Sequence, residues 1–287
     1  MTPRKGGIDL EAIRTRHPQH FAAVVRNRAR RIALVTLAVA VLIFGMAELG
    51  FFDRKLWSGG ARLIDIVGLM LPPDPGDWAH ARIFSAVLLE TVAIAFAGTL
   101  AAAVLAVPLG LLAARNVTLS RLVRFLSRRS LDTIRSIDIL VWALIWVNVV
   151  GLGPFAGVLA LMTADIGSFG KLFSEAIEAA DKKPVEGILS TGARPLLAVR
   201  FGLLPEVFPV IASQVLYYFE SNTRSATIIG IVGAGGIGLH LAEAIRTLEL
   251  QQVSFIVLMI LVTVAAIDFV SGKLRFALIG RQGAAIA

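Results

Sequence analysis

Residues 84–114 read FSAVLLETVAIAFAGTLAAAVLAVPLGLLAA, an apolar run in which Glu90 is the single charged side chain. A helix of about 20 apolar residues crosses about 30 Å of hydrocarbon, so this run is long enough to span a bilayer. Two further runs, Ile32–Gly50 and Gln252–Val270, have the same character. The sequence therefore predicts an all-α polytopic membrane protein.

The composition of the whole chain agrees with that interpretation. Of 287 residues, 56% are hydrophobic and 17% charged, and the mean hydropathy is +0.78. Such values lie outside the range of ordinary soluble domains. The absence of cysteine excludes disulfide bonds, thiolate metal sites and a cysteine nucleophile. The four histidines are scattered without zinc-ligand spacing, so we predict neither a metal site nor a cofactor.

The basic residues predict which segments lie in the cytoplasm, because cytoplasmic loops of membrane proteins are rich in Lys and Arg. Residues 1–31 carry eight basic and two acidic side chains, which predicts a cytoplasmic tail before a retained first transmembrane helix at 32–50. Binding of this tail to anionic lipid is an alternative role. The apolar stretch at 139–162 contains Gly151-Leu-Gly-Pro154, and such a cluster favours a turn. Splitting it there predicts helices over about 131–150 and 154–179.

The same charge argument assigns the remaining segments. We predict one helix from Pro205 to about Gly230, then a glycine-rich turn, then a short re-entrant or outer-face helix to about Glu249. This arrangement leaves the C-terminal basic residues in the cytoplasm. Those residues are Lys273, Arg275 and Arg281. We therefore predict six transmembrane helices with both termini cytoplasmic. Residues 51–83 form an extracytoplasmic loop, and residues 84–280 form the core.

Polar groups within the predicted helices are candidates for a transport path. A charged side chain near the bilayer centre costs about 2.5–3.5 kcal/mol, so it should face a pathway or an interface. An arginine among hydroxyl and amide donors suits a phosphate-like or phosphonate-like anion. Alternatively, Glu220 and Arg224 form an i,i+4 ion pair that only closes a helix interface. The candidates are Asp165, Ser168, Glu220, Ser221, Asn222, Arg224, Ser225 and Thr227.

A glycine-rich segment at 233–238 matches the dinucleotide-binding pattern GxGxxG. That pattern needs a preceding strand and a soluble βαβ unit, whereas membrane helices are expected on both sides here. The glycines therefore predict a sharp turn and close approach of helices. They are Gly233, Gly235, Gly236 and Gly238. The chain has no GxxxxGK[ST] phosphate loop, so it is not predicted to hydrolyse ATP by that mechanism.

The segment Glu186-Gly-Ile-Leu-Ser-Thr-Gly192, followed twelve residues later by Leu204-Pro205, is a polar stretch between apolar helices. Without further information it is compatible with an ordinary cytoplasmic loop. Its spacing resembles the coupling motif of the membrane subunits of ATP-binding-cassette (ABC) importers, within a predicted coupling loop at 180–205. The resemblance assigns contact with an ATPase to Glu186, Gly192, Leu204 and Pro205. The sequence departs from the motif where Gly187-Ile188 replaces two alanines and Gly202 replaces isoleucine.

Four further segments, within about residues 82–280, extend the resemblance to phosphonate-importer permeases, the PhnE family. They are VGLGPFAG (150–157), KLFSEAIE (171–178), YFESNTRSAT (218–227) and VGAGGIG (232–238). The glycine-rich segment is shared with methionine-importer permeases, so FESNTRS (219–225) is the part that points to phosphonate.

The resemblance implies a type I ABC importer transmembrane domain in a bacterial inner membrane. It would be a homodimer with two ATPase subunits and an extracytoplasmic phosphonate-binding protein. It would form the path for phosphonate, phosphate or phosphite by ATP-driven alternating access, and it would not itself be an enzyme. An ion-coupled secondary transporter of a small anion and a membrane-embedded enzyme are the alternatives.

Overall fold

The computed structural model describes residues 18–51, 54–118 and 120–283, and all regular structure within these ranges is helical. The chain forms two compact units, which meet in sequence between Gly68 and Leu69. Helices α2 (Pro18–Glu48) and α3 (Arg54–Leu69) make up the first unit. Residues 1–17 of the predicted basic tail lie outside the described residues.

The first unit contains one helix that is long and apolar enough to cross a membrane. Within α2, the stretch Arg30–Glu48 has no buried residue. This stretch corresponds to the first transmembrane helix predicted at 32–50. The helix begins earlier, at Pro18, so it also includes part of the predicted basic tail.

Part of the predicted extracytoplasmic loop at 51–83 is helical. Helix α3 occupies sixteen of its residues. The apolar side chains of Leu63, Ile64 and Val67 share one face of this helix, whereas Arg62 and Asp65 share the opposite face. The mixed charges of the segment therefore belong to an amphipathic helix rather than to irregular chain.

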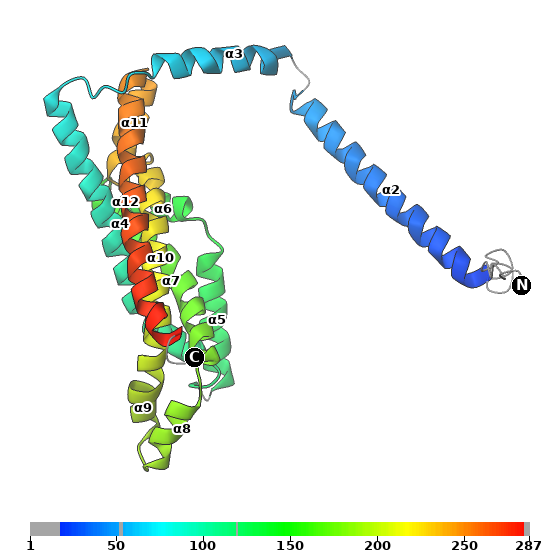
Figure 1. Ribbon diagram of the computed structural model, residues 1–287, viewed down its shortest axis with the longest axis vertical. Helices are drawn as coiled ribbons and strands as arrows, with labels where there is room; N and C mark the ends of the chain where they lie inside the picture. Colours follow the sequence, from blue (N-terminus) through cyan, green and yellow to red (C-terminus); the bar gives the residue numbers. More distant parts are fainter. Residues whose placement is uncertain (1–17, 52–53, 119, 284–287) are drawn as a thin grey trace, which may run out of the picture. The chain divides into compact units, whose positions relative to one another are not determined.

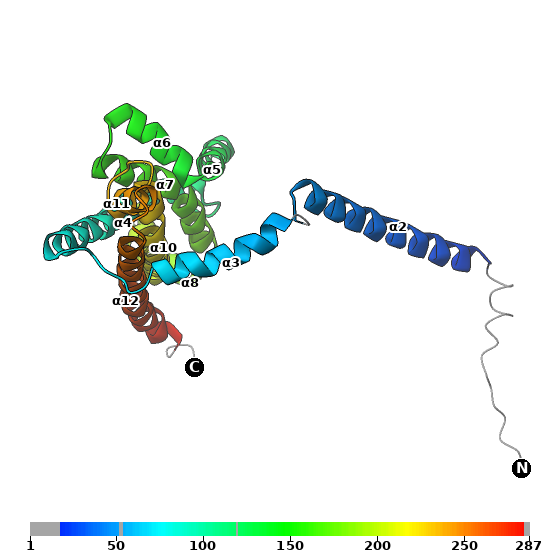
Figure 2. The ribbon, with the colours of Figure 1, turned by 90° about the horizontal axis from the view of Figure 1, so that it is seen from above.

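The second unit is a bundle built on four long helices that run side by side (Figure 1). They are α4 (Trp78–Ala113), α7 (Pro154–Ala179), α10 (Leu204–Gly230) and α12 (Leu250–Gly283). Shorter elements connect them: α5 (Arg121–Arg135), α6 (Ile139–Val150), α8 (Lys183–Ser190), α9 (Pro195–Ala198), the π-helical turn η1 (Val199–Leu203) and α11 (Ile237–Arg246). Viewed from above, α7 and α10 lie near the centre of this unit (Figure 2).

The six predicted transmembrane segments have counterparts among the described residues. Five helical stretches are long and apolar enough to cross a membrane, and α5 with α6 supplies a sixth if the bent pair is counted as one. The helix predicted over about 131–150 is therefore not continuous, because α5 and α6 meet at 88°. The side chain of Asp138 accepts a hydrogen bond from the Leu140 N–H at 2.8 Å and so starts a new helix.

The second unit begins before the predicted core boundary at 84. The Ser254 hydroxyl donates to the Met70 carbonyl at 2.6 Å, and Met70 packs against the cluster that contains Phe84 and Ile256. Asp77 caps α4 by accepting the His80 N–H at 2.7 Å, and this hydrogen bond lowers the pKa of the Asp77 carboxyl. Residues 69–83 therefore belong with the bundle.

The turn between α10 and α11 is built from glycines. Gly233, Gly235 and Gly236 have φ values of +90°, +82° and +80°, a region that glycine adopts without strain. A Cβ atom on Gly238 would overlap the Thr227 carbonyl oxygen of α10. The segment with the GxGxxG spacing thus joins two helices, and the described residues contain no strand before it.

Helix α4 holds the start of α11 in place. The Ile237 N–H donates to the Thr91 hydroxyl at 2.8 Å, and the Gly236 N–H donates to the Glu90 carboxylate at 3.1 Å. These bonds satisfy backbone groups that the first turn of a helix leaves without partners. The apolar run quoted above therefore also positions the glycine turn.

Replacing Gly238 with alanine should destabilise the bundle, because the added methyl group meets backbone that cannot rotate away. We expect Gly238→Ala to lower the free energy of unfolding by about 1–3 kcal/mol. The apparent melting temperature of the purified protein in detergent measures this loss. Gly272→Ala in α12 is the control, since an added Cβ there meets nothing within 4 Å. Equal melting temperatures for the two variants would contradict the close packing at Gly238.

Candidate functional site

A buried polar network joins the three helices α4, α7 and α10. The Asn222 side-chain amide donates to the Thr99 hydroxyl at 2.8 Å and also to the Asp165 carboxylate. Asp165 is 6% exposed and Asn222 is 4% exposed. A buried polar group without a partner is costly, so this shared amide fixes the register of the three helices.

The network lies well inside the length of the bundle. Thr99 is fourteen residues before the end of α4 at Ala113, and Asp165 is fourteen residues before the end of α7 at Ala179. At 1.5 Å per residue, both residues lie about 21 Å from the end of the bundle that carries α8. Two of the predicted path residues, Asp165 and Asn222, are thus enclosed between helices of one chain.

A second group of polar residues is charged and lies where α10 meets α12. The Glu220 carboxylate pairs with the Arg224 guanidinium at 3.3 Å, which is the i,i+4 ion pair considered from the sequence. It also pairs with Arg275 of α12 at 3.2 Å. Arg275 was predicted to lie beyond the last transmembrane helix. Helix α12 continues past Arg275, alongside α10, so this pair forms beyond the predicted end of the last transmembrane helix at Val270.

Arg224 belongs to a stripe on α10 that the described residues leave largely uncovered. Tyr217, Arg224, Ile228 and Ile231 are exposed, and Ser221 is half-buried between them. In chain order, positions 217, 221, 224, 228 and 231 are four, three, four and three residues apart, which places them along one face of the helix. An arginine on a lipid-facing stripe is unfavourable, so this face requires a partner protein or water.

The other predicted path residues are spread around the two helices. Ser168 on α7 and Ser225 on α10 are half-buried, and the Ser225 hydroxyl donates to the Ser221 carbonyl at 3.4 Å. Thr227 is buried, and its hydroxyl donates to the Thr223 carbonyl at 3.3 Å. The structure therefore brings Asp165 together with Asn222, and Glu220 together with Arg224.

The segment predicted as a coupling loop forms a helix–turn–helix projection at one end of the bundle (Figure 1). Helix α8 carries Glu186, which is exposed, and the chain then turns at Gly192 with a φ of +82°. Helix α9 and η1 return the chain to α10. A positive φ is strained for residues with a side chain, so glycine suits this bend.

The base of this projection is firmly attached to the bundle. The Asp181 N–H donates to the Glu206 carboxylate at 2.7 Å, so the segment entering the projection is bonded to the first turn of α10. Val185 and Val199 pack against the buried cluster that contains Ile177 and Val207. The projection is therefore in direct contact with residues of α7 and α10.

Gly202 departs from the isoleucine of the coupling motif, and the structure shows why glycine suits this chain. A Cβ atom at Gly202 would lie 3.1 Å from the Val185 Cα and 3.2 Å from the Ile188 side chain. Glycine lets η1 pack directly on α8. The two arms of the projection consequently support one another.

The outer surface of the projection carries exposed apolar side chains. Leu196 is 78% exposed and Phe201 is 60% exposed, and Leu189 and Leu197 are also exposed. The described part of the projection also has the charged residues Lys182, Lys183 and Arg194 on its surface. Exposed apolar groups of this kind, rimmed by charges, are typical of protein–protein contact sites.

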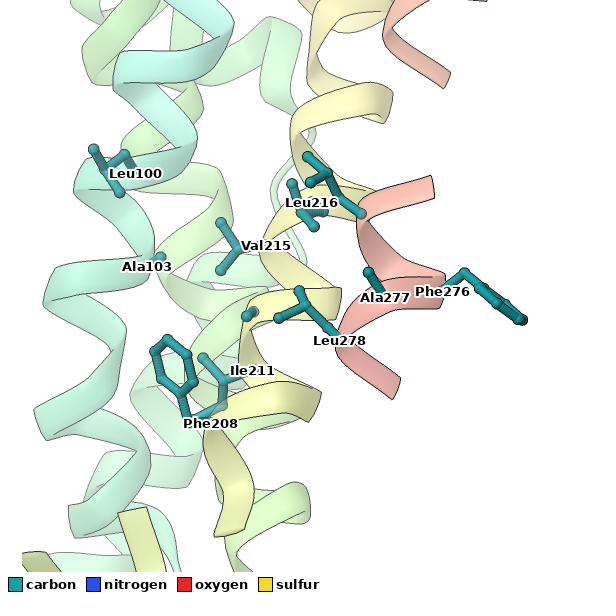
Figure 3. Close-up of a pocket in the computed structure, with 11 residues that line it drawn as sticks. Leu100, Ala103, Phe208, Ile211, Val215, Leu216, Phe276, Ala277 and Leu278 are labelled. Atoms are coloured by element: carbon teal, nitrogen blue, oxygen red, sulfur yellow. The ribbon is translucent and has the colours of Figure 1, made fainter. Parts of the chain in front are cut away.

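An apolar groove of about 970 Å³ lies between α4, α10 and α12 (Figure 3). Leu100 and Ala103 of α4 face Ile211 and Val215 of α10 across it, and α12 contributes Leu278. Its lining contains no charged side chain. A groove of this composition suits lipid acyl chains and does not suit an oxyanion, which requires charged or hydrogen-bonding partners.

Two residues of these polar groups were not singled out in the sequence. Thr99 completes the buried network, and a threonine in the middle of an apolar helix was its only signal. Arg275 completes the charged group, and the i,i+7 spacing of Asp268 and Arg275 on α12 was its signal. Within the described residues, no group of three or more His, Asp or Glu side chains is arranged to hold a metal ion.

Comparison with known sequences identifies relatives along most of the chain. The family described as "Binding-protein-dependent transport system inner membrane component" matches residues 106–280. The putative phosphite transport system permease protein HtxC of Stutzerimonas stutzeri is 38% identical over 261 residues, which cover 89% of this chain and 91% of that protein. The putative cryptic phosphonate transport system permease protein PhnE2 of Escherichia coli K12 is 51% identical over 117 residues, covering 41% and 96%.

Solved structures share the fold of the bundle. The inward-facing MetNI methionine ABC transporter contains a chain that superposes with a TM-score of 0.61 and 20% identity, covering 70% of this chain and 99% of that chain. At this identity the likeness concerns the fold, which is that of a type I ABC importer transmembrane domain. The prediction of an all-α type I ABC importer transmembrane domain is thereby confirmed.

Removing the shared amide of the buried network should destabilise the protein. We expect Asn222→Leu to lower the free energy of unfolding by about 1–3 kcal/mol, because the Asp165 carboxylate loses its donor. Asn148→Leu on α6 is the matched control, since the Asn148 amide bonds to the Leu144 carbonyl of its own helix. Melting curves in detergent compare the two variants. An Asn222→Leu protein as stable as the control would contradict a structural role for the network.

Proposed function

This chain belongs to the family of binding-protein-dependent transport system inner membrane components, and we propose that it forms the transmembrane path of an importer for phosphorus oxyanions. Its substrate would be a phosphonate or the related phosphite or phosphate. The observation that carries the proposal is the anchored projection formed by α8, α9 and η1. Its exposed surface and rigid base suit a subunit that receives mechanical work from a partner.

The partners follow from the family and from the free surfaces of the chain. We propose that two copies associate, because a second copy would cover the stripe of α10 that contains Arg224. Two ATPase subunits would bind the projections through Glu186, Gly192 and the exposed apolar side chains. An extracytoplasmic binding protein would deliver the anion at the opposite end, and the complex would lie in a bacterial inner membrane.

The choice of substrate class has two supports. Relatives of this chain carry the names of phosphite and phosphonate transport permeases. In addition, Arg224 lies on the uncovered face of α10, where a guanidinium can bind a tetrahedral oxyanion with two hydrogen bonds. An oxyanion cannot cross bare hydrocarbon, so such a cation on the path lowers the cost of desolvation.

The mechanism we propose is alternating access. ATP binding would draw the two ATPase subunits together and so bring the two projections closer. Because each projection is bonded to the base of α10, this helix would move as a body and open the path toward the binding protein. ATP hydrolysis would return it to the inward-open state.

The assembly is tested by purification in mild detergent together with the ATPase encoded for the same transporter. Wild-type protein should retain the ATPase, and its ATP hydrolysis should rise when phosphite-loaded or phosphonate-loaded binding protein is added. Uptake that collapses with an ionophore while ATP remains would instead favour an ion-coupled secondary transporter. Recovery of the chain without any ATPase would also favour a secondary transporter.

The bend at Gly192 should be essential for coupling. Gly192→Ala places a side chain at a φ of +82°, at a cost of roughly 1–2 kcal/mol, and the bend should reshape to relieve the strain. We expect ATP-dependent uptake to fall severalfold and the ATPase to co-purify poorly, with normal membrane insertion. Gly187→Ala on the exposed side of α8 is the matched control and should keep wild-type uptake, because an added Cβ there meets nothing within 4 Å.

Glu186→Ala should have the same effect on ATPase binding as Gly192→Ala. Glu175→Ala, which removes an exposed carboxylate of α7 outside the projection, is its control. If Glu186→Ala and Gly192→Ala both transport normally, the projection is not the site of coupling.

A further inference from the structure

The Glu220 carboxylate is shared by two arginines from different helices. Its Oε1 atom pairs with Arg224 of α10 at 3.3 Å, and its Oε2 atom pairs with Arg275 of α12 at 3.2 Å. The Glu220 side chain itself is 10% exposed. A carboxylate so deeply buried requires at least one cation beside it, and here it has two.

The two arginines are held unequally. Arg275 is 23% exposed and pairs with a second carboxylate, Asp268, at 3.7 Å. Its guanidinium also lies 5.8 Å from the centre of the Tyr217 ring. Arg224 is 49% exposed, and Glu220 is its one carboxylate partner among the described residues. Arg224 is therefore the arginine that can leave Glu220 at the lower cost.

The position of Arg224 determines what it meets when it leaves. It lies on the uncovered stripe of α10, between Tyr217 and Ile231, whereas Glu220 points between α10 and α12 toward Arg275. A rotation of the Arg224 side chain away from Glu220 moves its charge toward the uncovered side. Glu220 remains paired with Arg275, so no carboxylate is left buried without a cation.

We propose that Glu220 is a built-in substitute for the transported anion. In the empty transporter the Glu220 carboxylate occupies Arg224, and a tetrahedral phosphorus oxyanion displaces it. Arg275 is the positioning residue that holds Glu220 during this exchange. The inference rests on the proposed function, because it assigns the exchange to the oxyanion substrate of the same path.

This arrangement suits a transporter that must release its substrate. The oxyanion competes with a tethered carboxylate, so the net gain on binding Arg224 is small. When the path opens to the other side, the return of Glu220 to Arg224 displaces the anion. The exchange also keeps Arg224 paired with an anion in both states, which avoids an unpaired charge at membrane depth.

Paired substitutions test the separate roles of Glu220, Arg224 and Arg275. Uptake of phosphite and methylphosphonate is measured in cells that express the complete transporter. We expect Arg224→Gln and Arg275→Gln each to lower the maximal uptake rate by about tenfold or more, since each removes a charge-assisted bond. Glu220→Gln keeps a hydrogen-bond acceptor, so it should lower the maximal rate by less than about threefold, but it removes the competing charge and should lower the KM for uptake. Lys273→Gln is the control on α12. The Lys273 ammonium lies over the Phe269 ring, 4.3 Å from its centre, and so has a different partner from Arg275.

The decisive comparison is between the two double variants. Adding Glu220→Gln to Arg275→Gln should restore uptake to the level of Glu220→Gln alone, because Arg275 then has no carboxylate to hold. Adding Glu220→Gln to Arg224→Gln should restore nothing, because the substrate still lacks its cation. Rescue of both arginine variants would overturn the proposal and leave Arg224 as a structural partner of Glu220. Rescue of neither would overturn the role of Arg275.

Two further measurements separate this test from failures of folding and of the proposed function. Each variant is purified with its ATPase, and the amount of assembled complex normalises the uptake. Should Arg275→Gln not assemble, Arg275→Lys keeps the charge and should transport, whereas loss of uptake in an assembled Arg275→Lys complex would overturn the proposal. A wild-type transporter that takes up none of phosphonate, phosphite and phosphate would overturn the proposed function itself.

Discussion

The structure depends on the high cost of a charged or polar side chain without a partner inside a bilayer, which makes pairing within the protein a strong requirement. The amide of Asn222 meets this requirement for Asp165 and Thr99 at once, which ties three helices at one level. Glu220 meets it through two arginines from two helices. The two groups lie two residues apart on α10, so one short segment of this helix is bonded to all three other long helices of the bundle.

Helix α10 therefore connects the two ends of the proposed mechanism. Its first turn accepts the backbone N–H of Asp181 through Glu206, at the base of the projection. About 21 Å further along, at 1.5 Å per residue, the same helix carries Glu220. The helix is continuous from the projection to Arg224, although Pro209 removes one of its backbone hydrogen bonds near the base. Its far end is fixed by the glycine turn against α4 and α7.

Much of this fold could be predicted from hydropathy and turn residues. The bounds of α7 follow from Pro154, which starts the helix, and α10 ends at the predicted Gly230 before its glycine-rich turn. The break between α5 and α6 was not predicted, because hydropathy alone does not mark the helix cap that Asp138 forms. Hydropathy marks only where the apolar run ends at Val270, whereas α12 continues as a helix and brings Arg275 to Glu220.

The same reasoning distinguishes the two candidate polar groups in function. Asp165 and Asn222 are closed off by α4, α7 and α10, so a passing anion would have to separate three packed helices to reach them. Arg224 needs no such separation, because its side chain already lies on the uncovered stripe. A site that must bind and release its ligand in every cycle requires accessible groups with replaceable partners. Arg224 with Glu220 has both properties, whereas the Asp165 network has the enclosed geometry of a structural element.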